Sequence, residues 1–561
     1  MLTAMSAFSS RLRFDRWGLL VLPLVAFLAL FFIFPTLTVL LRSVTDFNPP
    51  ESGGLDNYTW FFDSSTNLVV LRRTLVSAFA VTAICLLVAY PYAYLLTTVG
   101  ARTRALLLGV VVVAGFTSFM VRNYAWLVIL QDNGPLNDAI AALGLSRVEF
   151  IGTDLGVAIV FTQILLPLMV LPLYATMRGI DRRLLMAGAS LGARPLKRFL
   201  SVYLPLSLPG IAAGCLLVFV LTLGFYVTPA LIGSPTNALY SQLMQIQVGQ
   251  LLAWGHVGAM AVVLIGVTLA LLAICAGVAR RWRVPEQEGG TLGLYRPEGG
   301  WRLSPGRAAL WALCGLTVLL LVGPMLVVFP QSFAGEASIA FPPESWSTQW
   351  YENFFSDPIW TDSLWRSLGV GLVSTALATA LGCMAALALV RGSFPGKPLV
   401  GALLVTPMIL PLVVFAVGVY AVFLDWQLVG SFEGFVLAHT ALAVPLVVVI
   451  VGAGLRSFDT RLEDAAASLG AGRAKAMATV TLPVLLPSIA TAALFAFLTS
   501  FDEVLASVFI SSPTASTLPV EMYRTVQRGA DPTIAAAASL ILVATVVLML
   551  GAWRLRRVTH A

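Results

Sequence analysis

The sequence predicts an all-helical membrane protein with twelve transmembrane helices in two parallel, pseudo-symmetric halves of six. Of its 561 residues, 58% are hydrophobic and only 11% are charged, whereas soluble chains carry about 25% charged residues. Twelve apolar runs can each cross a bilayer, and one signature recurs in both halves. This composition excludes a soluble enzyme, a secreted module and a disordered protein. Unbroken apolar runs of about 20 residues also argue against a transmembrane β-barrel.

Each apolar run supplies the roughly 20 residues that a helix needs to cross the hydrocarbon core. The first set lies near 17–41, 71–97, 105–130, 154–176, 208–228 and 255–279. The second set lies near 308–330, 363–390, 399–424, 431–452, 487–509 and 533–553. The first run follows Arg11, Arg13 and Arg16, as a signal peptide would. It is too long for the apolar region of a signal peptide and no small-x-small cleavage site follows, so we expect an uncleaved helix.

The distribution of positive charge predicts that both termini lie in the cytoplasm. With the N-terminus inside, the cytoplasmic segments hold 26 of the 34 Lys and Arg residues and the external segments hold seven. The remaining one, Arg122, falls within an apolar run. Lys and Arg concentrate on the cytoplasmic side of membrane proteins, and one missed span would scramble this asymmetry, so the pattern supports twelve spans.

The second half repeats a signature of the first, with Asp459 at the position of Asp181. Residues 181–212 read DRRLLMAGASLGARPLKRFLSVYLPLSLPGIA and residues 459–490 read DTRLEDAAASLGAGRAKAMATVTLPVLLPSIA, which are identical at 17 of 32 positions. Both copies follow the fourth predicted span of their half, and six spans per half give the halves one orientation. We therefore expect a first half over 1–283, a polar cytoplasmic linker over 284–307 and a second half over 308–561.

Each repeated loop, 178–207 and 456–486, combines a short helix of small residues with a glycine bend. The residues concerned are Ala187, Ala189, Gly192, Leu204, Pro205, Asp464, Ala465, Ala466, Gly470, Leu482 and Pro483. Alanine lets another surface approach closely, glycine permits a sharp bend, and the prolines are expected to set where the next span begins. One copy alone would suit an interfacial helix-turn-helix on lipid headgroups. Two copies at symmetric positions favour a partner with two equivalent sites.

These loops resemble the EAA motif of permease subunits in binding-protein-dependent ABC importers. The family pattern is Glu-Ala-Ala, then Gly, then a hydrophobic-x-Leu-Pro ending, and the second loop matches it at Asp464, Ala465, Ala466, Gly470, Val480, Leu482 and Pro483. The first loop has Met186-Ala187-Gly188 in place of the triplet. The resemblance implies a type I importer fold in a bacterial cytoplasmic (inner) membrane, with each loop docking one of two cytoplasmic ATPase subunits. It also implies a soluble substrate-binding protein on the outer face.

The sequence contains no phosphate-binding loop of its own. The nearest imitation of G-x-x-x-x-G-K-[ST], at 392–398, has the wrong spacing. We therefore expect no catalytic residue and no cofactor in this chain, with ATP and Mg²⁺ bound by the partner ATPase. The five cysteines lie in apolar runs and the three histidines are far apart, so we expect no metal site. Nothing indicates a nucleic-acid partner.

Three charged residues lie within predicted spans, Arg122 in the third and Asp502 and Glu503 in the eleventh. An ionised side chain at the bilayer centre costs about 3 kcal/mol on insertion scales. One interpretation is a structural salt bridge between Arg122 and an acid. Another is a translocation path whose carboxylates attract a cation. On a continuous helix the two adjacent acids point about 100° apart, so only one can face a central path. Glu503 lies on the more polar face, and we therefore predict Glu503 for the path and Asp502 for a structural partner of Arg122.

Aromatic residues flank these charges, among them Tyr124, Trp126, Phe225 and Tyr226. They suit either packing and an interface belt or a cation–π path for an organic amine.

The segments around these residues resemble the permeases of spermidine/putrescine importers. Arg122–Trp126 and Gln131–Asn137 are similar to the first permease, and Ser500–Glu503, Leu518-Pro519 and Tyr523-Arg524 to the second. The resemblance implies two permeases fused in one chain that moves a polyamine or related organic amine. Other importers of this group carry ferric iron, thiamine, opines or aminophosphonates. An ion-coupled secondary transporter is the alternative from another class, although it would not need a duplicated docking motif.

Overall fold

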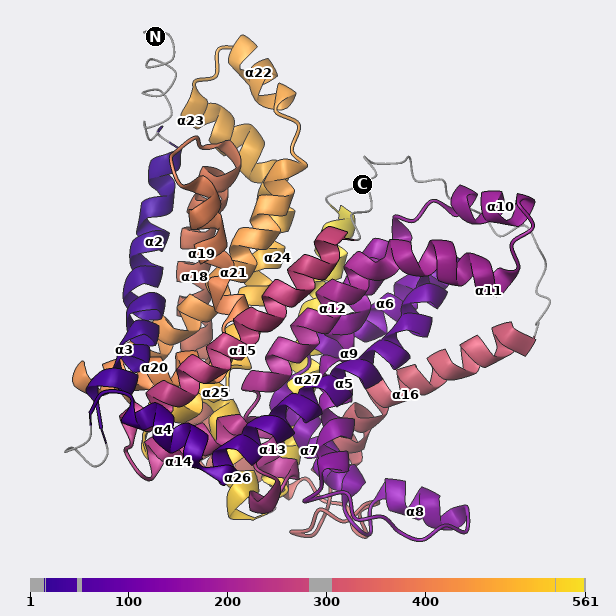
Figure 1. Cartoon of the computed structure of the whole chain (residues 1–561), viewed down its shortest axis with the longest axis vertical. Coiled ribbons are helices and arrows are strands. Elements are labelled where there is room, and N and C mark those ends of the chain that lie inside the picture. Colours follow the sequence, from indigo (N-terminus) through magenta and orange to yellow (C-terminus); the bar gives the residue numbers. More distant parts are fainter. Residues whose placement is uncertain (1–14, 16, 48–52, 282–304, 530, 559–561) are drawn as a thin grey trace. The chain divides into compact units, whose positions relative to one another are not determined.

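The computed structural model describes Asp15 and residues 17–47, 53–281, 305–529 and 531–558, and these residues are overwhelmingly helical (Figure 1). Within them, β-structure is limited to two isolated bridges, Ala334 with Trp346 and Ser512 with Ala515. The all-helical fold class is therefore confirmed. The predicted linker lies outside the described residues as far as residue 304, as do Arg11, Arg13 and Arg16.

Within the described residues, ten helices are long and apolar enough to cross a membrane, and the count reaches twelve if each of two bent pairs is one span. The ten are Gly18–Thr45 (η1, α2, η2, α3), α5 (Ser65–Thr98), α9 (Asp154–Arg178), Pro195–Gly224 (α11, η3, α12), Trp254–Cys275 in α15 (Trp254–Arg281), Gly306–Ser332 in α16 (Pro305–Ser332), α18 (Pro358–Arg391), α21 (Phe432–Arg456), Arg473–Phe501 (α23, η5, α24) and Thr533–Gly551 in α27 (Thr533–Val558). Shorter helices connect them: α4 (Asp56–Asp63), α8 (Pro135–Ala142), α14 (Tyr240–Gly249), α17 (Gln349–Ser356) and α26 (Leu518–Arg528).

The third predicted span of each half is bent rather than continuous. The chain bends by 96° between helix α6 (Ala101–Phe116) and the helices that follow from Phe119, and by 96° between α19 (Lys397–Ile409) and α20 (Leu412–Asp425). At the first break, the Ser118 hydroxyl caps α7 (Phe119–Leu130) by accepting the N–H of Met120 at 3.2 Å. At the second, Pro411 stands directly before α20. Both runs are apolar on either side of the break, so hydrophobicity alone predicted straight helices.

As predicted, the Leu-Pro pairs at Pro205 and Pro483 stand in the first turn of α12 (Leu204–Gly224) and α24 (Leu482–Phe501), but they do not mark the start of the continuous helical run. The helices start earlier, at Pro195 and Arg473, and continue through the Leu-Pro pairs. Just before each pair the helix widens into a π turn, η3 (Phe199–Tyr203) and η5 (Met477–Thr481). Proline has no N–H and its ring crowds the carbonyl four residues earlier, so a widened turn relieves that clash.

The internal repeat is visible in the helices themselves. With the halves aligned on their shared signature, α9 corresponds to α21, η3 to η5, and α13 (Val227–Ile232) to α25 (Leu505–Ile510). The long helices α12 (Leu204–Gly224) and α24 (Leu482–Phe501) also begin at equivalent residues. The two halves therefore share the same order of helices, π turns and breaks in this region.

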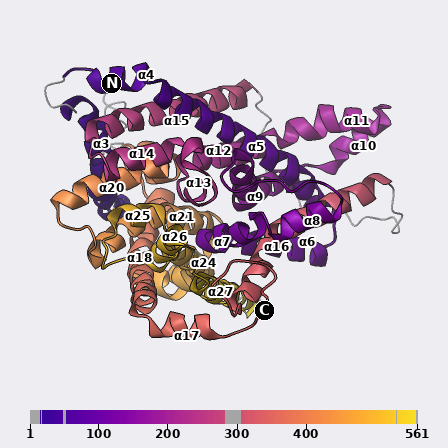
Figure 2. The same ribbon diagram turned by 90° about the horizontal axis from the view of Figure 1, so that it is seen from below.

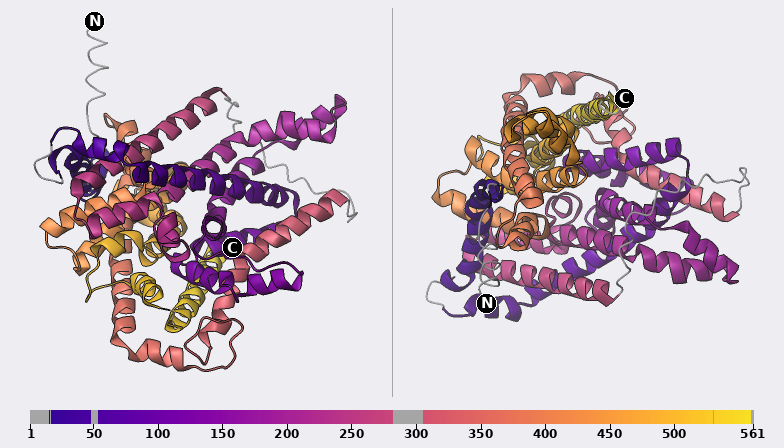
Figure 3. Two further views of the ribbon diagram at one scale, coloured as in Figure 1. Left: turned by 60° about the horizontal axis from the view of Figure 1, so that its bottom comes forward. Right: turned by 90° about the horizontal axis from the view of Figure 1, so that it is seen from above.

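The chain folds into two compact units, and each unit combines most of one half with the first span of the other. Unit 1 comprises 1–54, 355–524 and 546–561; unit 2 comprises 55–354 and 525–545. In unit 1 the first span packs on α18 and α20, and in unit 2 α16 packs on α5, α6 and α7. Figure 3 shows both exchanges by colour: the indigo first span beside orange helices, and the salmon α16 beside purple ones. The predicted halves, 1–283 and 308–561, are units of the sequence repeat. Whether each half is also a domain stays a prediction.

Close helix packing builds the centre of each unit. Helices α18, α21 and α24 pack together in unit 1, and α5, α9 and α12 in unit 2 (Figure 2). Glycine permits these contacts: a Cβ atom at Gly382 on α18 would lie 2.5 Å from Cγ1 of Val447 on α21. Small residues are the usual means by which membrane helices approach this closely.

Candidate docking loops and translocation path

The first docking loop contains the predicted short helix and bend. Helix α10 (Arg182–Ser190) begins after Asp181, whose carboxylate accepts the N–H of Arg183 at 2.9 Å. It carries Ala187 and Ala189 on exposed positions and ends before Gly192, which has a φ of +77°. This left-handed conformation is one that glycine adopts without strain. Figure 1 shows α10 at the end of unit 2 opposite α8.

The second docking loop has the same construction in unit 1. Helix α22 (Arg461–Ser468) carries Asp464, Ala465 and Ala466. Gly470 follows with a φ of +84°, and nothing lies within 4 Å of a Cβ atom built on it. Its conformation, and not a lack of space, therefore requires glycine. The short helix and glycine bend are confirmed in both loops, while docking to an ATPase stays a prediction.

Each loop also carries an exposed leucine that the motif pattern does not include. Leu191 is 87% exposed and Leu469 is 89% exposed, immediately before the bends. Both belong to the Ser-Leu-Gly-Ala sequence that the two loops share, which was the available signal. A leucine held in water at equivalent places in two loops suits a surface that a partner covers.

Arg122 is buried within unit 2. It lies on α7 with only 1% of its surface exposed. Its Nη1 donates a hydrogen bond to the carbonyl of Ile164 on α9 at 3.1 Å, and its guanidinium lies 4.8 Å from the ring centre of Phe119. A carbonyl dipole and an aromatic face both stabilise a cation in a dry environment. Tyr124 and Trp126 are buried on the same helix. Pairing between Arg122 and an acid stays a prediction.

The two acids do not lie on a continuous helix, so the argument that assigned them to different helix faces is wrong. Helix α24 ends at Phe501, and α25 begins at Leu505. Glu503 lies in this break, is nearly buried, and its Oε1 accepts the N–H of Ala506 at 2.7 Å. A carboxylate in this place satisfies a free N–H and favours the start of the helix.

A buried histidine holds the two sides of this break together. His439 on α21 places Nδ1 2.9 Å from the Ser500 hydroxyl and Nε2 2.8 Å from the Ser507 hydroxyl. Ser500 belongs to α24 and Ser507 to α25, so one ring spans the break. His439 is one of the three histidines that lie too far apart in the sequence to predict a metal site. Its place in an apolar run was the signal, because polar groups inside membrane helices need partners.

The equivalent break in unit 2 is lined by aromatic side chains instead. Phe225 lies at the position of Glu503, and Phe161 at the position of His439. Phe225 packs edge-on against Phe161 at 5.3 Å and against Phe119 at 5.4 Å between ring centres. Tyr226 is also buried there. Phe225 thus packs among aromatic rings, whereas the second half has polar groups in the same position; a role in a path stays a prediction.

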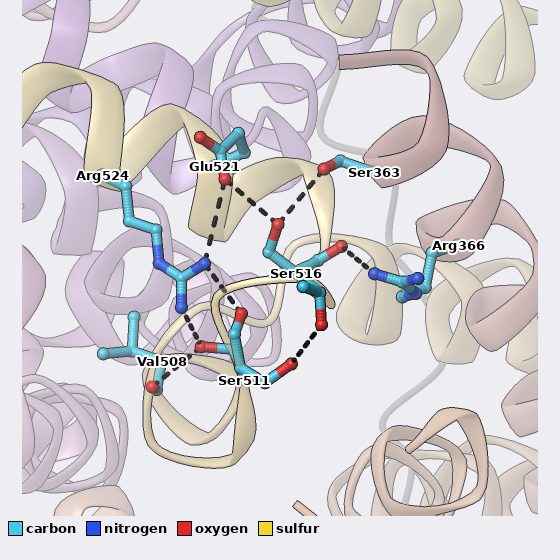
Figure 4. A network of polar contacts seen from close by, with 9 residues as sticks. Ser363, Arg366, Val508, Ser511, Ser516, Glu521 and Arg524 are labelled. Carbon is cyan, nitrogen blue, oxygen red and sulfur yellow. Dashed lines mark hydrogen bonds and ion pairs between the residues drawn. The ribbon is translucent and has the colours of Figure 1, made fainter. Parts of the chain in front are cut away.

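A polar network fastens the segment after α25 (Figure 4). The buried Glu521 on α26 accepts a hydrogen bond from the Ser516 hydroxyl at 3.1 Å and lies 3.9 Å from Arg524. Arg524 donates to the Ser511 hydroxyl at 2.7 Å. Arg366, on α18, donates to the Ser516 carbonyl at 3.4 Å. The network thus joins α18, the 511–517 segment and α26 within unit 1. In the described part of the chain, no group of three His, Cys, Asp or Glu side chains is placed to hold a metal ion.

These features define a multi-pass membrane permease, and comparison with known proteins identifies its family. The family described as "Binding-protein-dependent transport system inner membrane component" matches residues 378–560. The spermidine/putrescine transport system permease protein PotB of Haemophilus influenzae is 36% identical over 193 residues, covering 34% of this chain and 67% of that protein. PotB of Escherichia coli is 35% identical over 202 residues, covering 36% and 73%. The chain belongs to this family of inner membrane transport components.

A second kind of permease matches as well. The spermidine/putrescine transport system permease protein PotC of Escherichia coli is 28% identical over 234 residues, covering 42% of this chain and 88% of that protein. Each relative covers less than half of this chain, which together with the internal repeat agrees with two permeases joined in one polypeptide. Among solved structures, a bacterial alginate ABC transporter in complex with an alginate pentasaccharide-bound periplasmic protein is 18% identical over 46% of this chain and 92% of that chain, with a TM-score of 0.38.

Proposed function

We propose that this chain is a membrane-spanning part of an ATP-driven importer in a bacterial cytoplasmic membrane, with both termini in the cytoplasm. A soluble binding protein delivers a small solute to the outer face, and two copies of a cytoplasmic ABC ATPase dock on the inner face. ATP and Mg²⁺ bind to the ATPase and not to this chain. The observation that carries the proposal is the pair of equivalent loops, each with a short helix, a left-handed glycine and an exposed leucine.

The proposed solute is a polyamine or a related organic amine. Two relatives at about one-third identity or more are named as spermidine/putrescine permeases. The buried carboxylate of Glu503, beside the polar groups that His439 holds, supports a cationic solute. The proposed path comprises Arg122, Tyr124, Trp126, Phe225, Tyr226, Asp502 and Glu503. Ferric iron, thiamine, opines and aminophosphonates are the alternative cargoes within the same importer class.

Reconstitution tests the class and the cargo together. The chain is inserted in proteoliposomes with its ATPase and binding protein, and uptake of radiolabelled spermidine and putrescine is measured with and without ATP. We expect uptake only with ATP, with competition by other amines. Uptake driven by a proton or sodium gradient without ATP would overturn the importer proposal in favour of a secondary transporter. ATP-dependent uptake of thiamine or ferric iron in place of amines would overturn only the cargo.

A matched pair of glycines tests the docking loops. Gly470→Ala places a side chain on a left-handed residue, which costs about 1–2 kcal/mol. Gly472→Ala is the control, because Gly472 has a φ of −64° and equally free space around its Cβ position. We expect the first variant to insert normally and lose most ATP-dependent uptake, and the second to keep it. Ala466→Arg should also insert and lose uptake, because its side chain blocks close approach. Normal uptake by correctly assembled Gly470→Ala and Ala466→Arg variants would contradict docking at α22.

Glu503→Gln tests the proposed electrostatic path. The amide oxygen can still accept the N–H of Ala506, so the substitution removes the charge and keeps the cap. We expect lower amine uptake with unchanged assembly, whereas Asp502→Asn should mainly lower stability. Normal spermidine transport by Glu503→Gln, with binding protein and ATPase saturating, would refute the path.

A further inference from the structure

Arg391 joins separate parts of unit 1 at the base of the second docking helix. It is the last residue of α18, and its Nη2 forms an ion pair with Oε1 of Glu463 on α22 at 2.8 Å. The side chains are 15% and 25% exposed, so solvent screens this pair less than a surface pair. The Glu463 carboxylate also accepts a hydrogen bond from the Thr481 hydroxyl on η5.

The same guanidinium reaches the beginning of the first span. It lies 5.7 Å from the ring centre of Trp17 and 5.6 Å from that of Phe458. Next to it, the carboxylate of Asp15 accepts the N–H of Gly18 at 2.6 Å and the N–H of Ser393 at 3.0 Å. The start of the first span is thus fixed to the loop after α18, two residues from the arginine that binds α22.

The first docking loop cannot form this connection. In the alignment of the two loops, Leu185 stands at the position of Glu463, and Tyr203 at the position of Thr481. A leucine carries no charge, so this position of α10 cannot form the ion pair. The glycine bends are the same in both loops. The two docking helices differ in the side-chain contacts of this position, because only α22 carries an acid here that can pair with an arginine.

We propose that Arg391 and Glu463 are positioning residues that hold α22 in a fixed orientation against α18 and the start of the first span. The two docking helices are therefore mechanically unequal: movement of α22 is passed to the membrane helices through this ion pair, while α10 moves without it. Both residues act through α22, and neither belongs to the proposed solute path. The transport consequence rests on the proposed function, whereas the fixed orientation does not.

Spin labels on the two docking helices test the orientation in the whole chain without any partner. Ala467 on α22 and Ala189 on α10 occupy equivalent, exposed positions, and each is replaced by a labelled cysteine after the five native cysteines are changed to alanine. Arg391→Ala and Glu463→Gln should raise nitroxide mobility at 467 and leave it unchanged at 189. The charge swap Arg391→Glu with Glu463→Arg should restore much of the order. Unchanged mobility at 467, or an equal increase at both labels, would overturn the proposal.

Transport by the reconstituted complex tests the mechanical consequence. We expect each single variant to lower spermidine taken up per ATP hydrolysed by about tenfold, and the charge swap to recover part of it. Arg147→Ala is the control, because it breaks a 2.9 Å ion pair with Asp138 at a half-exposed surface site, and it should change neither readout. If nitroxide mobility at 467 rises while spermidine uptake per ATP stays normal, the ion pair only stabilises the structure, and the proposed transfer of movement through it is refuted. Wild-type protein without ATP-dependent uptake would refute the proposed function, and the label measurement would still decide the orientation.

Discussion

Replacing His439 by phenylalanine should weaken unit 1 at the break between α24 and α25. The substitution removes both bonds to Ser500 and Ser507, at 2.9 and 2.8 Å. It also copies the first half, where Phe161 occupies the equivalent position. A ring of similar volume remains, so the loss of hydrogen bonds is separated from the creation of a cavity.

The expected loss follows from the burial of this bridge. Side-chain hydrogen bonds in membrane proteins contribute about 0.6 kcal/mol each on average. An unsatisfied buried hydroxyl costs about 1–3 kcal/mol, but serine can turn to a carbonyl of its own helix and recover part of this. His439 is fully buried and both its bonds are lost together, so we expect the free energy of unfolding to fall by about 1–3 kcal/mol.

Equilibrium unfolding in mixed micelles measures this change. Single and double variants of His439 and Ser507 form a cycle, and a bridge predicts that their effects are not additive by at least about 0.5 kcal/mol. Thr440→Val is the control, because the Thr440 hydroxyl donates only to the Val436 carbonyl of its own helix, and its loss should cost little. Additive effects together with unchanged stability of His439→Phe would refute the bridge.

Three further predictions concern other contacts. Gly382→Ala forces a methyl group into the α18–α21 contact and should destabilise the protein by about 1–3 kcal/mol, whereas Gly277→Ala, in open space on α15, should not lower the melting temperature. Glu521→Ala removes the buried acceptor of Figure 4 and should cost about 1–3 kcal/mol in unfolding experiments, with the exposed Glu344→Ala as a neutral control. Segment 331–362, which the predicted orientation places outside, carries five acids and no Lys or Arg. ATPase stimulation by the proposed binding protein should therefore fall as salt rises, and a response independent of salt would contradict electrostatic docking there.

The sequence was sufficient for the features that depend on composition and repetition. Apolar length located the spans, and the duplicated signature located both docking loops with their bends at Gly192 and Gly470. These succeed because lipid requires long apolar helices, and because a left-handed residue strongly favours glycine. Both are local requirements that leave a direct mark on the amino acids.

Features that depend on tertiary contacts leave a weaker signal in the amino-acid sequence. The breaks after Phe116 and Ile409 lie in apolar runs on both sides, so the hydropathy pattern shows no interruption. The break at Glu503 depends on tertiary contacts, because its carboxylate caps α25 and the ring of His439 on α21 lies between two serines on either side of the break. The exchange of first spans is likewise invisible in sequence, because an apolar helix face does not specify which neighbour covers it.

The two halves share the same arrangement of helices along the chain but differ in the polarity of the side chains at equivalent positions. Glycine bends, π turns and breaks recur at equivalent positions of the two halves. The charged or polar group stands in the second half and an apolar one in the first at each of three positions: Glu463 with Leu185, His439 with Phe161, and Glu503 with Phe225. Two different sets of contacts thus support the same backbone: aromatic packing of Phe225 on Phe161 in the first half, and the hydrogen bonds of Glu503 and His439 in the second. Because both halves belong to one chain, they are always made in equal numbers, and each polar second half is joined to one apolar first half.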